Sequence, residues 1–201
     1  MKKMTLIAAL LVAMPTAWAD GDAQYADFKA MMDSSFRTKG IVDKYRMYQL
    51  DFQKACSGDK LPGKKVLAEI EAAQLKTIVY PADGKYFGDW KRGEKIAISG
   101  KGLTWSDKTP HDNGGGCYNC HQLSHHEISY GTIGPSLLEY GKARGSSDDV
   151  VKYTWGKIYN AKAYNACSNM PRNGDADILT EQQIKDVMAY LFDPQSPVNK
   201  K

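Results

Sequence analysis

The chain has 201 residues, of which 42% are hydrophobic and 25% charged, and its formal net charge is +4 at pH 7. This length suits one domain, or one domain with an extension. The lysines and arginines form no basic run and no patch interleaved with aromatic residues, so nucleic acid is not an expected partner.

The N-terminus has the features of an export signal. Residues 1–3 form a short positive segment, residues 6–12 are apolar, and Ala17-Trp18-Ala19 fits a signal-peptidase site. The apolar run is shorter than the roughly 20 residues that cross a bilayer, and no later stretch is long and apolar enough. We therefore expect a signal peptide over residues 1–19, cleavage after Ala19 and a periplasmic protein without a membrane span. Loss of the two leader lysines lowers the formal net charge to +2.

Residues 20–82 are predicted to form a helical extension ahead of a domain that covers residues 83–201. Large side chains recur in it every three or four residues, which is typical of amphipathic helices. Glycine, proline and serine clusters divide it into about three helices. It contains no motif for chemistry, so we expect its large side chains to pack it against the following domain. These side chains are Tyr25, Phe28, Met32, Phe36, Tyr45, Tyr48, Phe52, Val66, Ile70 and Ile78, with Ala73 in the last helix.

The second domain carries three further helical patterns. The first, with Phe87, Trp90 and Ala97, is amphipathic, and the second starts at residues 146–149 and contains Trp155. The last begins with a capping box and ends before Asp193-Pro194. No stretch shows the alternation of a strand, so the chain is predicted to be all-α. The last helix has Thr180 and Gln183 in the capping box and Ile184, Val187, Met188 and Leu191 in its apolar stripe.

The run Cys117-Tyr118-Asn119-Cys120-His121 is the most specific motif of the chain. A CxxCH sequence is the attachment signature of c-type haem. Cys117 and Cys120, one helical turn apart, would form thioethers to the haem vinyl groups, with His121 beneath the iron as the proximal ligand. The histidine and the export signal favour haem over a zinc half-site or a redox dithiol, and the remaining alternative is a disulfide loop beside an unrelated histidine.

The ligand on the opposite face of the iron determines the function, because an open face would bind gases or peroxide. Three other histidines are candidates. His125 and His126 are tethered too closely to His121 to reach that face, and we expect them at the surface or beside a haem propionate. We also expect His125 to lie one helical turn after His121, on the same face of the haem helix. His111, before the motif, is a weak alternative.

Met170 is the preferred distal ligand. It follows His121 by 49 residues, which is enough chain to reach the other face of the macrocycle. Pro171 excludes helical backbone at Met170. The only other methionine downstream of the motif, Met188, belongs to the apolar stripe of the last helix, so its expected role is core packing.

Two cysteines remain after haem attachment, Cys56 and Cys167. In an oxidising compartment an even remainder favours a disulfide. An intrachain Cys56–Cys167 bond is the default and would tie the extension to the region of the distal ligand. Two alternatives stay open: one or both residues bond to another chain, or Cys167 is free and competes with Met170 as a thiolate ligand.

The order of these features resembles class I cytochrome c over roughly residues 84–194. It runs from an amphipathic helix through CxxCH, a Gly-Pro loop and a Met-Pro loop to a capped terminal helix. In that family the proline after the haem motif offers its backbone carbonyl to Nδ1 of the proximal histidine. The resemblance implies that Pro135 does this for His121 and so fixes its tautomer.

A more specific resemblance is to SoxX, the monohaem subunit of the sulfur-oxidising SoxAX cytochrome. It rests on residues 134–145, 157–161, 166–172 and 193–199, and residues 88–95 and 102–107 fit as well. The resemblance implies one covalent haem c, a SoxA-like haem subunit as partner, the SoxYZ carrier as substrate protein and a small cytochrome c as electron acceptor.

The activity implied for that complex is L-cysteine S-thiosulfotransferase. It joins thiosulfate oxidatively to a cysteine of SoxYZ and releases two electrons, with the chemistry at the SoxA haem. The present chain would then be the electron relay of the enzyme and would hold no catalytic residue. The alternatives are an autonomous diffusible cytochrome c and a haem sensor with an open distal face.

Overall fold

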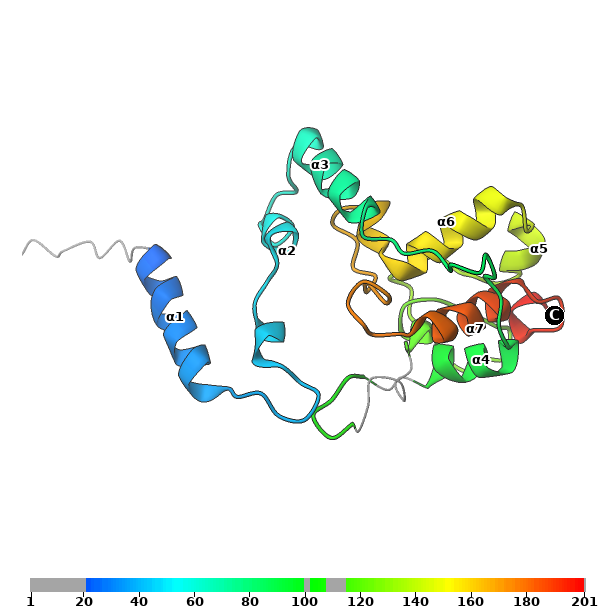
Figure 1. Ribbon diagram of the computed structural model, residues 1–201, viewed down its shortest axis with the longest axis horizontal. Coiled ribbons are helices and arrows are strands. Elements are labelled where there is room, and N and C mark those ends of the chain that lie inside the picture. The colour runs from blue at the N-terminus through cyan, green and yellow to red at the C-terminus, as the bar shows by residue number, and fades with distance from the viewer. Residues whose placement is uncertain (1–20, 100–101, 108–114, 201) are drawn as a thin grey trace, which may run out of the picture. The chain divides into compact units, whose positions relative to one another are not determined.

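The computed structural model describes residues 21–99, 102–107 and 115–200 (Figure 1). The chain divides into two compact units, residues 1–37 and residues 38–201. This division lies well before the boundary at residues 82/83 that the sequence suggests. Most of the extension is therefore part of the same unit as the domain that follows it.

The described part of the first unit consists of the helix α1 (Gly21–Ser35) and the two residues that follow it. An ion pair one turn apart, with 2.7 Å between Lys29 Nζ and Asp33 Oδ2, lies on its surface. Tyr25, Phe28 and Phe36 are 57%, 52% and 49% exposed. Their packing against the domain that follows stays a prediction.

The described residues of the second unit form helices and turns, with one isolated bridge between Lys39 and Val42 and no strand. The predicted all-α class of a class I cytochrome c is confirmed. None of the described helices is both long and apolar enough to cross a membrane. The elements are η1 (Lys44–Met47), α2 (Asp51–Ala55), α3 (Lys64–Leu75), α4 (Trp90–Ile98), η3 (Cys117–Asn119), α5 (Tyr140–Arg144), α6 (Asp148–Tyr159), η4 (Ala161–Ala163), α7 (Glu181–Phe192) and η5 (Pro197–Asn199).

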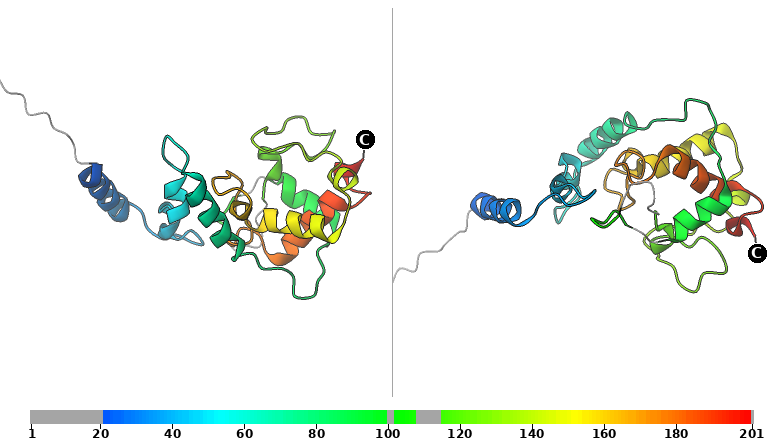
Figure 2. Two further views of the ribbon diagram at one scale, coloured as in Figure 1. Left: turned by 90° about the horizontal axis from the view of Figure 1, so that it is seen from above. Right: turned by 60° about the horizontal axis from the view of Figure 1, so that its bottom comes forward.

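Helices α4 and α7 pack closely against each other and form the frame of the domain (Figures 1 and 2). Gly93 permits the close approach, because a Cβ atom there would lie 2.0 Å from the backbone oxygen of Asp186. The carboxylate of Asp186 also joins the helices: it accepts hydrogen bonds from Arg92 Nε at 2.9 Å and from the Asp89 N–H at 2.8 Å. The frame thus combines a glycine contact with a buried carboxylate.

The last helix begins and ends as its sequence predicts. The Gln183 N–H donates to Thr180 Oγ1 at 3.2 Å, and the Thr180 N–H donates to Gln183 Oε1 at 2.8 Å. These reciprocal bonds are the predicted capping box. The helix ends at Phe192, directly before Asp193-Pro194.

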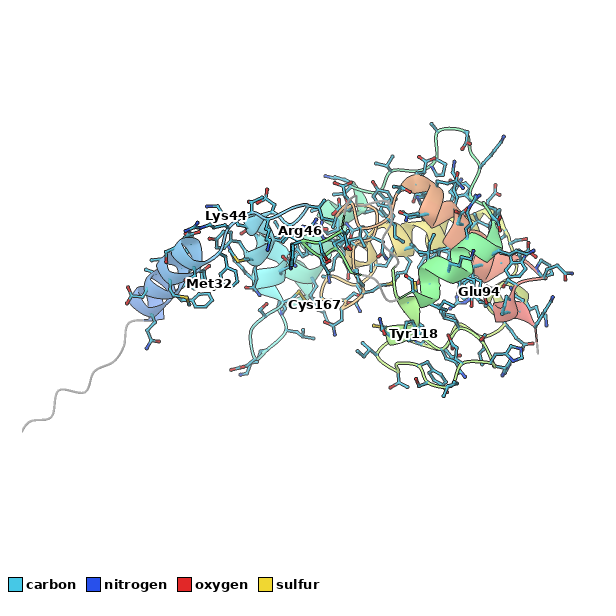
Figure 3. All side chains as sticks on the ribbon, turned by 90° about the horizontal axis from the view of Figure 1, so that it is seen from below. Met32, Lys44, Arg46, Glu94, Tyr118 and Cys167 are labelled. Carbon is cyan, nitrogen blue, oxygen red and sulfur yellow. A yellow bond between two sulfur atoms is a disulfide. The ribbon has the colours of Figure 1, made fainter. Side chains whose placement is uncertain are left out.

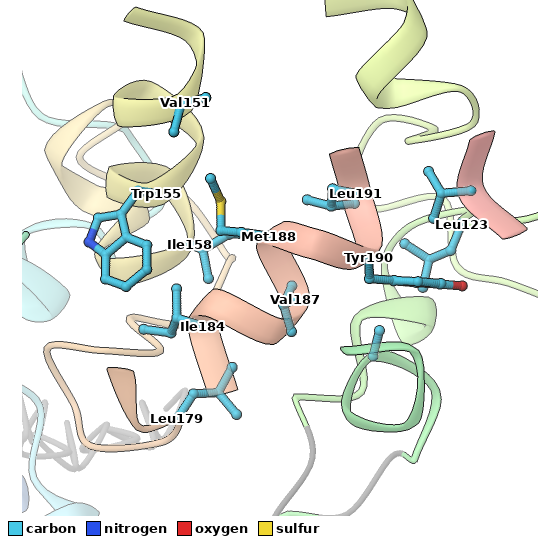
Figure 4. Close-up of a cluster of buried hydrophobic side chains, with 12 residues drawn as sticks. Leu123, Val151, Trp155, Ile158, Leu179, Ile184, Val187, Met188, Tyr190 and Leu191 are labelled. Carbon is cyan, nitrogen blue, oxygen red and sulfur yellow. The ribbon is translucent and has the colours of Figure 1, made fainter. Parts of the chain in front are cut away.

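The core lies between α6 and α7, and Figure 4 shows side chains of α6 facing Met188 and Ile184 of α7. Trp155, Ile184 and Met188 are fully buried. Burying a side chain of this kind contributes about 1.5–3 kcal/mol. Met188 therefore has the packing role expected of it. On another face of α7, Tyr190 lies beside Leu123 of the loop that follows the CxxCH motif (Figure 4).

Helix α3 packs against η4, the turn that follows α6 (Figure 2). Its half-buried face consists of Leu67, Ile70, Glu71 and Gln74, whereas Val66 is 41% exposed. The packing face of α3 is thus partly polar and differs from the apolar stripe that the sequence suggests.

Candidate haem site

The CxxCH motif folds into a single tight turn. Gly116 precedes it with a φ of 59°, in the left-handed region that favours glycine. The N–H groups of Cys120 and His121 both donate to the backbone oxygen of Cys117 at 3.0 Å. These two backbone hydrogen bonds fix the conformation of the five residues that carry both thiols and the imidazole.

His121 is oriented by the loop that follows it. Its Nδ1 lies 2.7 Å from the backbone oxygen of Pro135. Because a carbonyl oxygen only accepts, Nδ1 carries the proton and Nε2 keeps a lone pair for a metal. Gly134 lies in close contact with the ring, since a Cβ atom there would lie 2.2 Å from His121 Cε1.

Hydrogen bonds between backbones lock this loop onto the turn. The Gly131 N–H donates to Tyr118 O at 2.9 Å, and the Gly134 N–H donates to Cys120 O at 2.8 Å. A Cβ atom at Gly131 would lie only 1.8 Å from the backbone oxygen of Asn119. The two glycines therefore allow the backbone contact on which the position of Pro135 depends.

Cys117 and Cys120 are free, partly buried thiols. Burial raises the pKa of the Cys117 thiol to about 11. A reactive redox dithiol relies on a thiolate, which a lowered pKa provides. The raised pKa of Cys117 is the opposite of that arrangement, and the same turn carries His121 with its Nε2 free.

The chain does not continue as a helix after the motif, so the helical reason for rejecting His125 is wrong. Residues 122–130 form turns and irregular backbone. His125 and His126 are nevertheless exposed at the surface, one of the two environments expected for them. His111 lies outside the described residues.

Met170 lies in the irregular segment between η4 and α7. It is partly buried and packs against the same core cluster as Cys117. Its N–H donates to Ser168 Oγ at 3.2 Å, which shapes the bend before Pro171. The structure thus brings the CxxCH turn and Met170, far apart in sequence, to one hydrophobic cluster.

Cys56 and Cys167 are joined by a disulfide across 111 residues of sequence, with 2.00 Å between the sulfur atoms. Figure 3 labels Cys167, three residues before Met170. The bond takes Cys167 out of competition for iron as a thiolate. Closing a ring of this size contributes about 2–4 kcal/mol to stability.

Sequence reasoning missed Glu127, which supports the backbone after His121. Its Oε2 accepts hydrogen bonds from the N–H groups of Leu123 at 2.8 Å and Ser124 at 3.2 Å. Its Oε1 is buried and has no partner among the described residues. The signal was present, because Ser124-His-His-Glu127 has the S-x-x-E pattern of a capping box, although no helix follows it.

These residues fit a covalently attached haem. The site offers two free thiols at the attachment spacing, an imidazole Nε2 and a thioether, against a common apolar cluster. Haem held in this way would supply an iron centre that is oxidised and reduced by one electron. The fold and this donor set together define the class: a haem protein with a class I cytochrome c domain.

One comparison with known proteins agrees with this class, and a second gives a relative over nearly the whole chain. The family model for cytochrome c matches residues 100–193. A protein of Aquifex aeolicus (strain VF5) with the name "Uncharacterized lipoprotein" is 39% identical over 201 residues, covering 97% of this chain and 95% of that protein. The chain therefore carries a cytochrome c domain and belongs to one family with the Aquifex protein. The matched length includes most of the extension.

Proposed function

We propose that this chain is the monohaem electron-relay subunit of a SoxAX-type complex. The cytochrome c domain makes it a haem electron-transfer protein. The observation that carries the proposal is the hydrogen bond of 2.7 Å from His121 Nδ1 to Pro135 O, which leaves Nε2 free to ligate the iron of a bound haem. Cys117 and Cys120, in the same turn, would hold one haem c.

In this proposal Met170 is the distal ligand opposite His121. A thioether ligand favours ferrous iron and raises the reduction potential relative to a pair of imidazoles. With His121 and Met170 both bound to the iron, no coordination position would remain open for a substrate. This arrangement supports a relay over a sensor with an open distal face.

The SoxX assignment is supported by sequence segments that include the site. Residues 134–145 contain Pro135, and residues 166–172 contain Cys167 and Met170. The proposed partner is a SoxA-like haem subunit, at which thiosulfate is conjugated to the SoxYZ carrier cysteine. The two electrons released would pass through this chain to a small cytochrome c.

The name of the Aquifex protein raises a lipid anchor as an alternative. Bacterial lipoproteins carry their lipid on the cysteine that follows the signal peptide. Here the residue after the expected cleavage site is Asp20, and the first cysteine, Cys56, is in the disulfide. We therefore propose a periplasmic chain cleaved after Ala19. The intact mass tests this, because it should equal the chain from Asp20 plus one haem.

Reconstitution tests the proposed role. The isolated chain should be reduced by simple reductants and should not conjugate thiosulfate to a carrier cysteine. Activity should appear when a SoxA-like subunit is added. Full activity of the isolated chain would overturn the relay assignment. Capture of periplasmic proteins with mass spectrometry is the second test, and absence of a SoxA-like subunit among them would favour the diffusible carrier.

A further inference from the structure

The segment that carries Met170 is contacted by the extension at three places: the start, the middle and the end of that segment. Helix α6 ends at Tyr159, and the irregular chain then runs through residues 160–172 before α7. Helices α2 and α3, from the extension, provide the outer contacts of this segment. We call residues 51–78 the brace and residues 160–172 the distal segment.

At the start of the distal segment, Asn160 is fully buried. Its Nδ2 donates to Gln74 Oε1 at 2.9 Å and to Thr77 Oγ1 at 2.8 Å, both in the brace. Its Oδ1 accepts from the Lys162 N–H at 3.1 Å and caps η4. One buried amide thus fixes the beginning of the segment to the brace.

The middle of the segment is held by one hydrogen bond and one covalent bond. The Ala166 N–H donates to the Glu71 carboxylate of α3 at 3.1 Å. The next residue, Cys167, forms the disulfide with Cys56 at the end of α2. Both restraints act within four residues of Met170.

The end of the segment contacts the brace through Arg172. Its guanidinium carbon lies 5.1 Å from the centre of the Phe52 ring of α2, in the range of a cation–π contact. Met170 is therefore flanked by brace contacts at Cys167 and at Arg172. On its inner side it packs against the hydrophobic core.

We propose that the brace positions Met170 for iron, with Glu71 and the Cys56–Cys167 disulfide as its main positioning elements. This inference rests on the proposed ligation by Met170. The distal segment has only the short turn η4 as regular structure, so its own backbone does little to fix the thioether. The outer restraints limit the motion by which Met170 would leave the iron and be replaced by another ligand.

The test measures ligand exchange in the haem-loaded full chain. A Met–Fe(III) bond gives a far-red absorption band, and raising the pH until the band disappears measures how firmly Met170 is held. Glu71→Leu removes the acceptor for Ala166, and Cys56→Ser with Cys167→Ser removes the covalent restraint. Each change should lower the midpoint pH by about one unit, a tenfold shift in the exchange equilibrium, without loss of bound haem.

Two variants serve as matched controls. Glu71→Gln keeps an oxygen that accepts from Ala166, so its midpoint should stay close to that of the wild type. Glu71 also interacts electrostatically with Lys157 of α6. If it acted only through that charge, Glu71→Gln would behave like Glu71→Leu and contradict the positioning role. Lys65→Ala changes a side chain on α3 that is 89% exposed, and it should have no effect.

The outcomes separate the two proposals. If Met170→Ala leaves the band in place, the ligand assignment is wrong and the brace inference fails with it. If Met170→Ala removes the band and both Glu71→Leu and the double serine variant leave the midpoint unchanged, Met170 remains the ligand and the brace inference is overturned. If the double serine variant does not accumulate, Glu71→Leu, which alters one half-buried side chain, decides alone whether the brace positions Met170.

Discussion

The CxxCH turn is held by residues close to it in sequence, whereas the distal segment is held by residues far from it in sequence. The turn is held by the loop of residues 131–135, through backbone bonds and the His121–Pro135 contact. The distal segment is held by Gln74, Glu71 and Cys56, at separations of 86, 95 and 111 residues. The attachment site is therefore built locally, whereas the position of Met170 depends on a correctly folded extension.

The largest effect is expected for changes in the CxxCH turn. Replacing Cys117 and Cys120 together by alanine removes both thioether positions, so covalent haem should be lost completely. The intact mass of the purified variant, compared with that of the wild type, measures this. Recovery of the wild-type chain, folded but colourless, from a host with haem-attachment machinery would contradict the assignment.

A change at Met170 should affect the distal side alone. Met170→Ala should abolish the far-red Met–Fe(III) band and lower the reduction potential, because a thioether favours ferrous iron. Covalent haem should remain at one per chain. Visible spectroscopy and a redox titration of the same sample provide the readouts.

Met188→Ala is the matched control for that change. Met188 is fully buried in the core, so the variant should lose about 2–5 kcal/mol of unfolding free energy and keep the band. Disappearance of the band in Met188→Ala would show that the distal ligand has been assigned to the wrong methionine.

Gly134→Ala should disturb the proximal side by a smaller amount. The added methyl group would meet the His121 ring at 2.2 Å, so the loop has to move away from the imidazole. We expect a loss of about 1–3 kcal/mol in unfolding free energy, as for overpacked sites. Gly102→Ala, at a site with no atom within 4 Å of the new Cβ, should be neutral in the same denaturation experiment. Equal stability of both variants would mean that the Gly134 contact is easily relieved.

The smallest effect concerns the α4–α7 frame, which both sides share. Burial alone would raise the pKa of Asp186, but hydrogen bonds from Arg92, the Asp89 N–H and Gln182 outweigh it and lower the pKa below its usual 3.8. The stabilisation is therefore present above about pH 4 and is lost as the pH falls through the folded-state pKa. Asp186→Asn should cost about 1–2 kcal/mol at pH 7, since Arg92 is largely exposed.

Denaturation over a pH series checks this prediction. The difference in unfolding free energy between wild type and Asp186→Asn should shrink as the pH falls below about 4. A difference that stays constant down to pH 2 would show that the ionised carboxylate is not responsible.

The part of the site that could be predicted is the part formed by residues close together in sequence. The CxxCH spacing and the Thr180–Gln183 capping box are local patterns, and the structure contains both. The packing face of α3 was not predictable in this way. Periodicity of apolar residues selects Val66, Ile70 and Ala73, but Glu71 and Gln74 face the protein because their partners lie 86–95 residues later. Hydrogen bonds over such separations leave no periodic signal in the sequence.

The disulfide has a consequence for the order in which the protein matures. Four cysteines can pair in three ways, and if the chain is exported as proposed, Cys56 would emerge first and Cys167 last. The first thiols that Cys56 meets in the oxidising compartment are therefore Cys117 and Cys120. Thioether formation at those two residues leaves Cys56 and Cys167 as the only pair able to oxidise. On this proposal haem attachment would prevent wrong disulfides, and a host that lacks the attachment machinery should accumulate chains with Cys56 linked to Cys117 or Cys120, detectable by non-reducing peptide mapping.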